Sequence, residues 1–120
     1  MGKFVIRQTA TGYKFDLRAA NGEVIATSEV YATYASCQKG VESVAKCAVN
    51  AGLADMTAGT DAVNPKFELY QDKTGEYRFR LKARNGKIIA TSEAYKGKAS
   101  CENGIESVRN NVLDAPIVTE

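Results

Sequence analysis

The most constraining feature of this sequence is an internal repeat. Residues 13–50 match residues 77–114 at a constant offset of 64, with 19 identical positions in 38. Upstream the match continues at an offset of 63, so the second copy carries one extra residue between Gly75 and Tyr77. An insertion at this point indicates a turn. A duplication of this size predicts that each copy forms one supersecondary unit and that the two units complete a common core.

Within each copy, the first half has the pattern of three β-strands. Apolar and polar residues alternate strictly over residues 13–19, as expected of a strand with one buried face. Asn21-Gly22 and Asn85-Gly86 predict two-residue type I′ turns, in which both central residues have positive φ. Asp72–Gly75 instead resembles a type I turn that ends on a left-handed glycine. The expected strands are residues 3–8, 13–19 and 23–28, together with residues 66–71 and the other equivalent segments of the second copy.

After Tyr31 the spacing of apolar residues becomes helical. Thr33 is the predicted N-cap of a helix in the first copy, and Gly97 is its weaker counterpart in the second. Residues 52–54 and 116–118 follow these helices and are expected to form a short fourth strand in each copy. The apolar positions fall at i, i+4, i+7 and i+11 in both copies, and they are Cys37, Val41, Val44 and Ala48, then Cys101, Ile105, Val108 and Val112.

These elements predict an α+β fold made of two tandem β-β-β-α-β repeats. A single unit of roughly fifty-five residues buries too little apolar surface to be comfortably stable. We therefore expect one continuous antiparallel sheet shared by both copies, with two helices packed on one face and a pseudo-twofold axis. Residues 1–62 are expected to form the first repeat with its linker and residues 63–120 the second, together one compact unit. Such a chain is expected to be a monomer that acts as an internal pseudo-dimer.

The composition excludes several classes of enzyme. The chain has no histidine, which removes His-based nucleophile systems, His metal sites and imidazole general bases. Its three cysteines form no CxxC cluster of the kind found in zinc and thioredoxin-type sites. We therefore expect no enzymatic activity, no metal and no cofactor. No apolar signal segment follows Met1 and no apolar run approaches about eighteen residues, so we expect a soluble cytoplasmic protein without a membrane partner.

One strand of the second copy carries a row of basic residues. Arg78, Arg80, Lys82 and Arg84 occupy alternate positions and are expected to share an exposed face. A basic sheet face is able to follow a phosphate backbone, which makes weak nucleic-acid binding an alternative function. The formal net charge of only +2 argues against it. So does the alternation, which points the aromatic residues of these strands to the opposite face.

Two cysteines occupy equivalent places near the starts of the predicted helices. A helix N-terminus lowers the pKa of a thiol, so redox sensing by Cys37 and Cys101 is a third hypothesis. Both residues also lie on the apolar stripe, where a cysteine behaves as a small buried hydrophobe. The pattern therefore favours a structural role for these thiols.

A polar motif recurs where each third strand meets its helix. Thr27-Ser28-Glu29 precedes Tyr31, and Thr91-Ser92-Glu93 precedes Tyr95. A carboxylate beside hydroxyl groups is suited to a polar ligand or to general base catalysis. More often such a cluster satisfies backbone groups at a turn and a helix start, and this is the role that we expect.

The second copy carries a string of specific motifs. Residues 75–83, Asn85-Gly86, residues 90–95 and residues 99–108 closely resemble the YegP-like family of small, mostly bacterial proteins with one or two copies of this unit. The resemblance covers nearly the whole chain. It implies paired β3-α-β units in one sheet, with the last strand of each unit exchanged onto the other. It implies no activity, cofactor or partner.

The first copy departs from the family pattern at the start of its helix. Gln38-Lys39-Gly40 stands where the second copy has Glu102-Asn103-Gly104. A charged site at this position would therefore be intact only in the second copy. The leading prediction is a non-enzymatic binding or interaction module, because the chain lacks catalytic groups and its repeated residues have the pattern of a scaffold.

Overall fold

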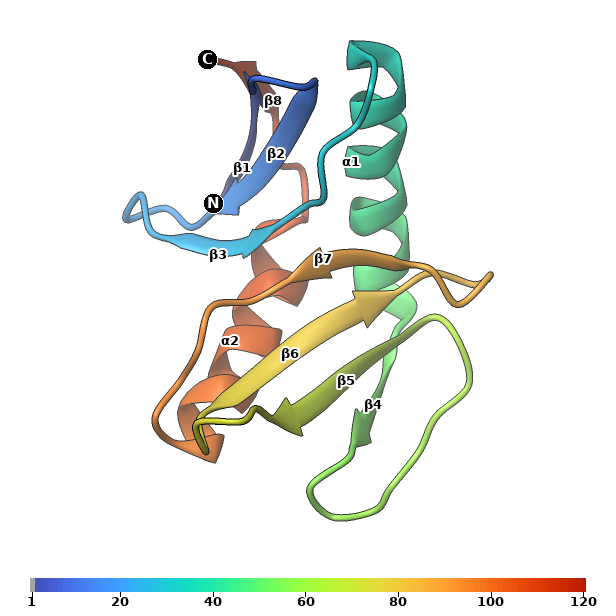
Figure 1. Ribbon diagram of the computed structural model, residues 1–120, viewed down its shortest axis with the longest axis vertical. Helices are drawn as coiled ribbons and strands as arrows, with labels where there is room; N and C mark the ends of the chain where they lie inside the picture. The colour runs from blue at the N-terminus through green and yellow to red at the C-terminus, as the bar shows by residue number, and fades with distance from the viewer. Residues whose placement is uncertain (1) are drawn as a thin grey trace.

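A computed structural model describes residues 2–120 and has the expected order of elements, with eight strands and two helices (Figure 1). In the first repeat these are β1 (Lys3–Gln8), β2 (Tyr13–Arg18), β3 (Val24–Thr27), α1 (Tyr34–Asn50) and β4 (Gly52–Asp55). In the second they are β5 (Lys66–Gln71), β6 (Tyr77–Lys82), β7 (Ile88–Thr91), α2 (Lys98–Asn111) and β8 (Ile117–Thr119). The α+β fold with two tandem repeats is thus confirmed.

All eight strands belong to one sheet in the order β4-β5-β6-β7-β3-β2-β1-β8. Each repeat gives its last strand to the other, since β4 pairs with β5 and β8 pairs with β1. Both exchanged strands run parallel to their partners, so the sheet is mixed and the expectation of a wholly antiparallel sheet is corrected at its two edges. The residue pattern indicates which segments become strands. Strand direction depends on where the preceding helix ends over the sheet, which no local pattern encodes.

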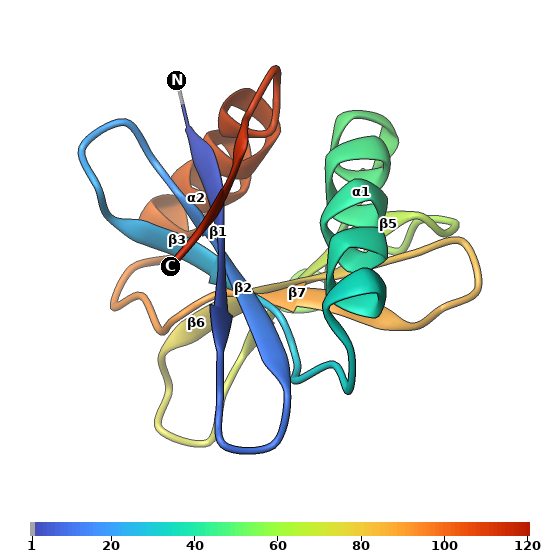
Figure 2. The ribbon, with the colours of Figure 1, turned by 90° about the horizontal axis from the view of Figure 1, so that it is seen from above.

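The two halves of the sheet meet at a narrow joint. β3 and β7 pair antiparallel through one residue pair, Thr27 and Thr91, and the half-sheets on either side are turned steeply relative to each other (Figure 2). Each helix spans this joint, because α1 contacts β2 of its own repeat and β5, β6 and β7 of the other. α2 likewise contacts both halves and also α1. The helices therefore fasten together two half-sheets that share little backbone pairing.

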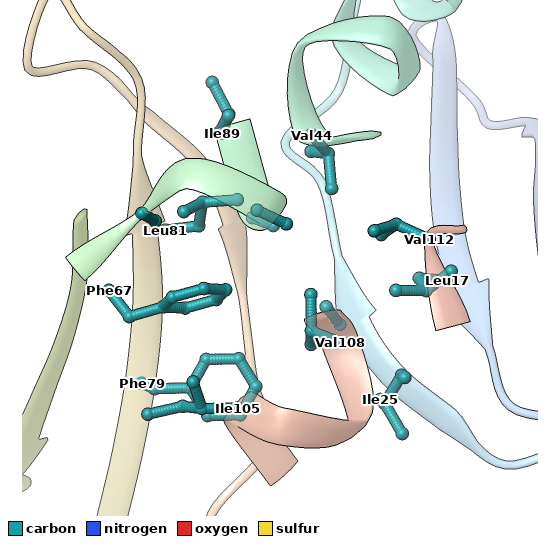
Figure 3. Close-up of a cluster of buried hydrophobic side chains, with 14 of the residues drawn as sticks. Leu17, Ile25, Val44, Phe67, Phe79, Leu81, Ile89, Ile105, Val108 and Val112 are labelled. Atoms are coloured by element: carbon teal, nitrogen blue, oxygen red, sulfur yellow. The ribbon is translucent and has the colours of Figure 1, made fainter. Parts of the chain in front are cut away.

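One hydrophobic core fills the space between the sheet and the helices. Figure 3 shows Val44 of α1 and Val108 of α2 between side chains of the two repeats. The phenylalanine pairs Phe4–Phe15 and Phe67–Phe79 have the same ring geometry, with centroids 5.9 Å apart and planes at 72° in both. This agreement reflects the pseudo-twofold symmetry. The helical apolar stripes expected from the sequence are buried in this core, and they comprise Cys37, Val41, Val44, Ala48, Cys101, Ile105, Val108 and Val112.

The hairpins at Asn21-Gly22 and Asn85-Gly86 differ from the expected type I′ turns. Only Gly22 (φ 87°) and Gly86 (φ 82°) have positive φ, and the preceding asparagines do not. The Gly22 N–H donates to the Ala19 carbonyl at 2.9 Å, which closes a four-residue turn with the glycine at its end. The Asn21 side chain accepts from the Glu23 N–H at 3.0 Å and so stabilises this alternative. The turn at Asp72–Gly75 has the predicted form, with φ of 87° at Gly75.

Both helices begin at the N-cap residues predicted from the sequence. The Thr33 side chain accepts a hydrogen bond from the Ser36 N–H at 3.1 Å and caps α1. Gly97 is the N-cap of α2 and supplies no side-chain hydrogen bond. α2 is also shorter than α1, with 14 residues against 17.

Candidate functional site on the outer face of the sheet

We call the side of the sheet opposite the helices the outer face. Strand alternation concentrates charge there. Of the 16 basic residues of the chain, eight lie on this face along β1, β2, β5 and β6, and the same strands place two acidic residues there. Three further carboxylates, Asp61, Asp72 and Glu120, pair with these cations from segments outside the four strands. The basic residues are Lys3, Arg7, Lys14 and Arg18 on β1 and β2, and Lys66, Arg78, Arg80 and Lys82 on β5 and β6; the acidic residues are Asp16 and Glu68.

Each half of the outer face is organised around one buried carboxylate. Asp16 is 3% exposed and lies 3.3 Å from Arg7 and 3.5 Å from Arg18, measured between charged atoms. Its counterpart in the second half is Glu68, on a different strand. A buried carboxylate needs charged partners because desolvation penalises its ionised form. Both carboxylates are therefore part of the scaffold, and each is shared by more than one cation.

Glu68 has the denser set of partners. Its oxygens lie 2.6 Å from Arg80 Nε, 3.2 Å from Lys82 Nζ and 3.5 Å from Lys66 Nζ. Burial raises the pKa of this carboxyl group, but hydrogen bonds from Arg80 and Lys82 outweigh burial and hold the pKa below its usual value. Glu68 thus lies among three cations, one of which, Lys66, also pairs with Asp61 at 2.9 Å.

The rim of the outer face carries further ion pairs. Asp72 accepts from Arg78 Nε at 2.9 Å, and hydrogen bonds from the Thr74 hydroxyl and Arg78 lower the pKa of Asp72 to about 2. Within residues 2–120, Lys3 and Lys14 have no acidic side chain within ion-pair distance. These two lysines are the outer-face cations available to a ligand without breaking an existing pair.

An aromatic side chain lies among the basic ones, which the sequence reasoning did not anticipate. Tyr70 is opposite Arg78 in the register of β5 and β6, and the Arg80 guanidinium sits 4.6 Å from the centre of the Tyr70 ring. The expectation that aromatic residues avoid the basic face is correct for β6 and wrong for its neighbour. Alternation along residues 66–70 was the available signal, since it places Tyr70 on the side of Glu68.

The four basic residues proposed from the sequence do not stay together. Three of them lie on the outer face of β6, each opposite a residue of β5. The register places Arg78 opposite Tyr70, Arg80 opposite Glu68 and Lys82 opposite Lys66. Arg84 does not lie on this face, because β6 ends at Lys82, where the pairing with β7 shifts register. Arg84 instead lines a pocket beside α1.

The thiol candidates lie in the core. Cys37 and Cys101 are each 0% exposed. Burial raises the pKa of both thiols, that of Cys101 to about 11. The thiolate is the reactive form, so this environment argues against redox sensing. Redox sensing stays a prediction. Rapid reaction of Cys37 or Cys101 with a thiol reagent in the native protein would support it.

The serines of the recurring polar motif form hydrogen bonds with the backbone. Ser28 Oγ accepts from the Phe15 N–H at 2.9 Å and donates to the Glu29 carbonyl at 2.7 Å. Ser92 makes the same two contacts with Phe79 and Glu93, at 2.9 and 2.8 Å. Both hydroxyl groups are thus engaged, as the structural interpretation of this motif predicts.

Residues 2–120 were also considered for metal binding and for membrane-spanning helices, and they have neither feature. That part of the chain contains no cluster of three or more Cys, Asp or Glu side chains arranged to hold a metal ion. Nor does it contain a helix whose length and apolarity would let it cross a membrane.

Comparison with known proteins supports the duplication and the fold. The family model described as "Domain of unknown function (DUF1508)" matches twice, at residues 9–55 and 72–118. The UPF0339 protein YegP of Yersinia pestis is 34% identical over 118 residues, which cover 98% of this chain and 94% of the relative. A UPF0339 protein of Treponema denticola is 60% identical over 53 residues, 44% of this chain but 91% of the relative.

Two solved structures have the same architecture. The solution structure of yegP from E. coli, titled a protein of unknown function, superposes with a TM-score of 0.82 at 30% identity and covers 99% of this chain and 92% of its own. The UPF0339 protein of Shewanella oneidensis superposes with a TM-score of 0.80 at 32% identity, covering 98% and 90%. The two repeats, the exchanged strands and these matches together show that the chain belongs to the YegP-like UPF0339 family of tandem DUF1508 repeats.

Proposed function

We propose that the protein is a non-enzymatic binding module that presents the outer face of its sheet to an anionic partner. The observation that carries this proposal is the concentration of eight of 16 basic residues on the face opposite the helices. The formal net charge of the chain is only +2, so the remaining surface is acidic on balance. A partner that is attracted by charge would therefore meet this face in a preferred orientation.

The chemistry of the repeated polar groups supports a non-enzymatic role. The Ser28 and Ser92 hydroxyl groups are committed to the backbone. Cys37 and Cys101 are buried with raised pKa values. Nucleophilic catalysis requires an accessible group with a suitable pKa, and these repeated hydroxyl and thiol groups do not supply one.

Elution from immobilised heparin tests this proposal with matched variants. Lys3→Gln/Lys14→Gln removes two unpaired cations from the outer face. Lys39→Gln/Lys96→Gln removes two exposed cations from α1 and the loop before α2 and changes the net charge equally. We expect the first variant to elute at clearly lower salt than the wild type and the second to elute close to it. Equal shifts in both variants would show that only net charge matters and would reject an oriented face.

Single-stranded nucleic acid is the second candidate for the partner, and one observation favours it. Tyr70 is half-buried beside Arg80 on the outer face, which combines an aromatic ring with positive charge. Proteins that bind single strands use this combination, because bases stack on aromatic rings while cations contact phosphates. The half-face of the second repeat thus has the elements of such a site.

Fluorescence titration with labelled single-stranded DNA and RNA tests this candidate. We expect binding that weakens steeply with salt, and that weakens further in Tyr70→Ala while Lys39→Gln/Lys96→Gln changes little. Tyr70→Phe is the matched control because it keeps the ring, and it should bind like the wild type. Absence of binding at about 50 mM salt would reject nucleic acid as the partner, whereas the heparin experiment tests the anionic face independently.

A further inference from the structure

A pocket of about 300 Å³ lies away from the outer face, between α1 and the β6–β7 hairpin. The C-terminal half of α1 forms one wall, and residues 83–85 form the other. Figure 1 shows the β6–β7 hairpin beside the lower end of α1. Pro65, just before β5, also lines it. This volume falls at the lower end of the range for small-molecule sites, which is roughly 300–1,000 Å³. The pocket is thus large enough for a small organic molecule.

The polar lining of the pocket is positive. Lys46 projects from α1 and Arg84 from the hairpin, and no acidic residue lines the pocket. Within residues 2–120, neither Lys46 nor Arg84 has an acidic side chain within ion-pair distance. The other polar groups in the lining are neutral, and they belong to Ser43, Cys47, Asn50 and Asn85. Two unpaired cations beside neutral hydrogen-bonding groups suit an anionic ligand.

The symmetry-related junction, between α2 and the β2–β3 hairpin, shows that the fold does not need these cations. At the offset of 64, Lys46 corresponds to Asn110 and Arg84 to Ala20. The equivalent of Asn50 is Asp114, which adds a negative charge. The equivalent helix–hairpin junction is therefore built with neither cation, and a purely architectural need does not explain Lys46 and Arg84.

At the equivalent junction the backbone before β1 lies closer to its helix. Pro65 corresponds to Gly2 at the offset of 63, and Cys47 corresponds to Asn111. A Cβ atom at Gly2 would lie 2.7 Å from Asn111 Cβ, so backbone and helix approach each other closely there. The two repeats have thus diverged at this junction in both charge and space.

We propose that the pocket binds a small organic anion through a phosphate or carboxylate group held by Lys46 and Arg84. A guanidinium group offers two parallel N–H donors to either anion, and a lysine adds a second positive charge. Ser43, Asn50 and Asn85 are placed to hydrogen-bond with polar groups on the rest of the ligand. This site is separate from the outer face and does not depend on the function proposed for it.

The test uses a variant that copies the symmetry-related junction, Lys46→Asn/Arg84→Ala. The equivalent junction already contains Asn110 and Ala20, so this variant is expected to fold. Two-dimensional amide NMR of wild type, titrated with glycerol 3-phosphate, succinate or inorganic phosphate, should show saturable shifts confined to residues 43–50 and 83–85. The variant should bind the preferred probe at least about tenfold more weakly. Lys39→Gln/Lys96→Gln, with the same change in net charge, should bind it as the wild type does.

Cys47 supplies a second readout because its half-buried thiol lines the pocket. The binding probe should slow its labelling by a thiol reagent in the wild type and not in Lys46→Asn/Arg84→Ala. Preference for glycerol 3-phosphate or for succinate identifies the anionic group, and either result supports the site. The proposal is overturned if no probe gives saturable shifts at about 10 mM, or if the variant binds as tightly as the wild type.

Discussion

At the scale of single residues, two glycines that the repeats share mark a close approach between helix and aromatic side chains. Gly40 and Gly104 both lie in helix interiors, where glycine is unfavourable relative to alanine by roughly 1 kcal/mol. The structure explains them. A Cβ at Gly104 would lie 2.5 Å from Tyr95 Oη and 3.0 Å from a ring carbon of Phe79. The glycine thus allows the helix to lie against the stacked aromatic pair.

Gly104→Ala is expected to destabilise the protein by about 1 to 2 kcal/mol, because overpacking at a stacked ring outweighs the better helix propensity of alanine. Urea unfolding followed by circular dichroism measures the change. Gly97→Ala is the control, since its Cβ would meet nothing closer than Ser100 Oγ at 3.8 Å. Adding Tyr95→Phe to Gly104→Ala should recover part of the loss. A neutral or stabilising effect of Gly104→Ala would show that the aromatic pair moves aside freely.

Asp72 predicts a pH dependence of stability. Its pKa is about 2 in the folded protein against 3.8 normally, owing to hydrogen bonds from Thr74 and Arg78. A depressed pKa means that the ionised carboxylate stabilises the fold above about pH 4, and that this contribution disappears as the pH falls toward 2. Asp72→Asn should therefore be less stable than the wild type at pH 6, and the difference should shrink between about pH 4 and pH 2. A difference that stays constant with pH would contradict this account.

At the scale of elements, the hairpins of the two repeats differ in how they meet the other half. Lys87, in the β6–β7 turn, pairs with Glu29 of the first repeat at 3.4 Å. The equivalents of these two residues are Glu23 and Glu93, both acidic. Burial raises the pKa of Tyr95 most, and the charges of Glu93 and Glu23 raise it further. Both carboxylates therefore lie near Tyr95. One junction is thus attractive and its counterpart is repulsive.

Glu23→Lys should stabilise the protein by restoring the charge pattern of the other junction. The pair would be exposed, so the expected gain is modest, roughly 0.3–1 kcal/mol, and should fall as salt is added. Thermal unfolding at low and high salt measures it. The reciprocal variant Lys87→Glu removes the pair with Glu29 and should lower the melting temperature. Equal melting temperatures for the wild type and Glu23→Lys at low salt would show that the charges of Glu23 and Glu93 do not affect stability.

At the scale of the whole molecule, strand exchange and helices that contact both half-sheets bind the two repeats into one structure. Direct pairing between the halves at the centre of the sheet is limited to Thr27 and Thr91. The outermost strand of each half, however, comes from the other repeat. We propose that residues 1–62 and 63–120 do not unfold separately, because loss of either repeat removes an edge strand and a helix from the other.

A destabilising core change in one repeat should therefore lower the stability of both. Leu81→Ala creates a cavity at a residue that is 0% exposed and should cost roughly 2–5 kcal/mol. Native-state hydrogen exchange should show a similar loss of protection in β2 and in β6, which belong to different repeats. Protection lost in the second repeat alone would show that the halves unfold independently.

The sequence by itself determined the elements of this protein. Short-range periodicity identified the strands, both helices and the Thr33 cap, because alternation and helical spacing report directly on which side chains are buried. It also found the basic residues of β6 and the duplication.

Tertiary structure decided what local pattern does not encode. The parallel direction of β4 and β8, and the joint at Thr27 and Thr91, depend on how helices cross the sheet. The same holds for the sites, since Tyr70 reaches Arg80 from a neighbouring strand, and Arg84 and Lys46 line one pocket from different elements. These neighbours are distant along the chain, and only the packing of both repeats around one core brings them together.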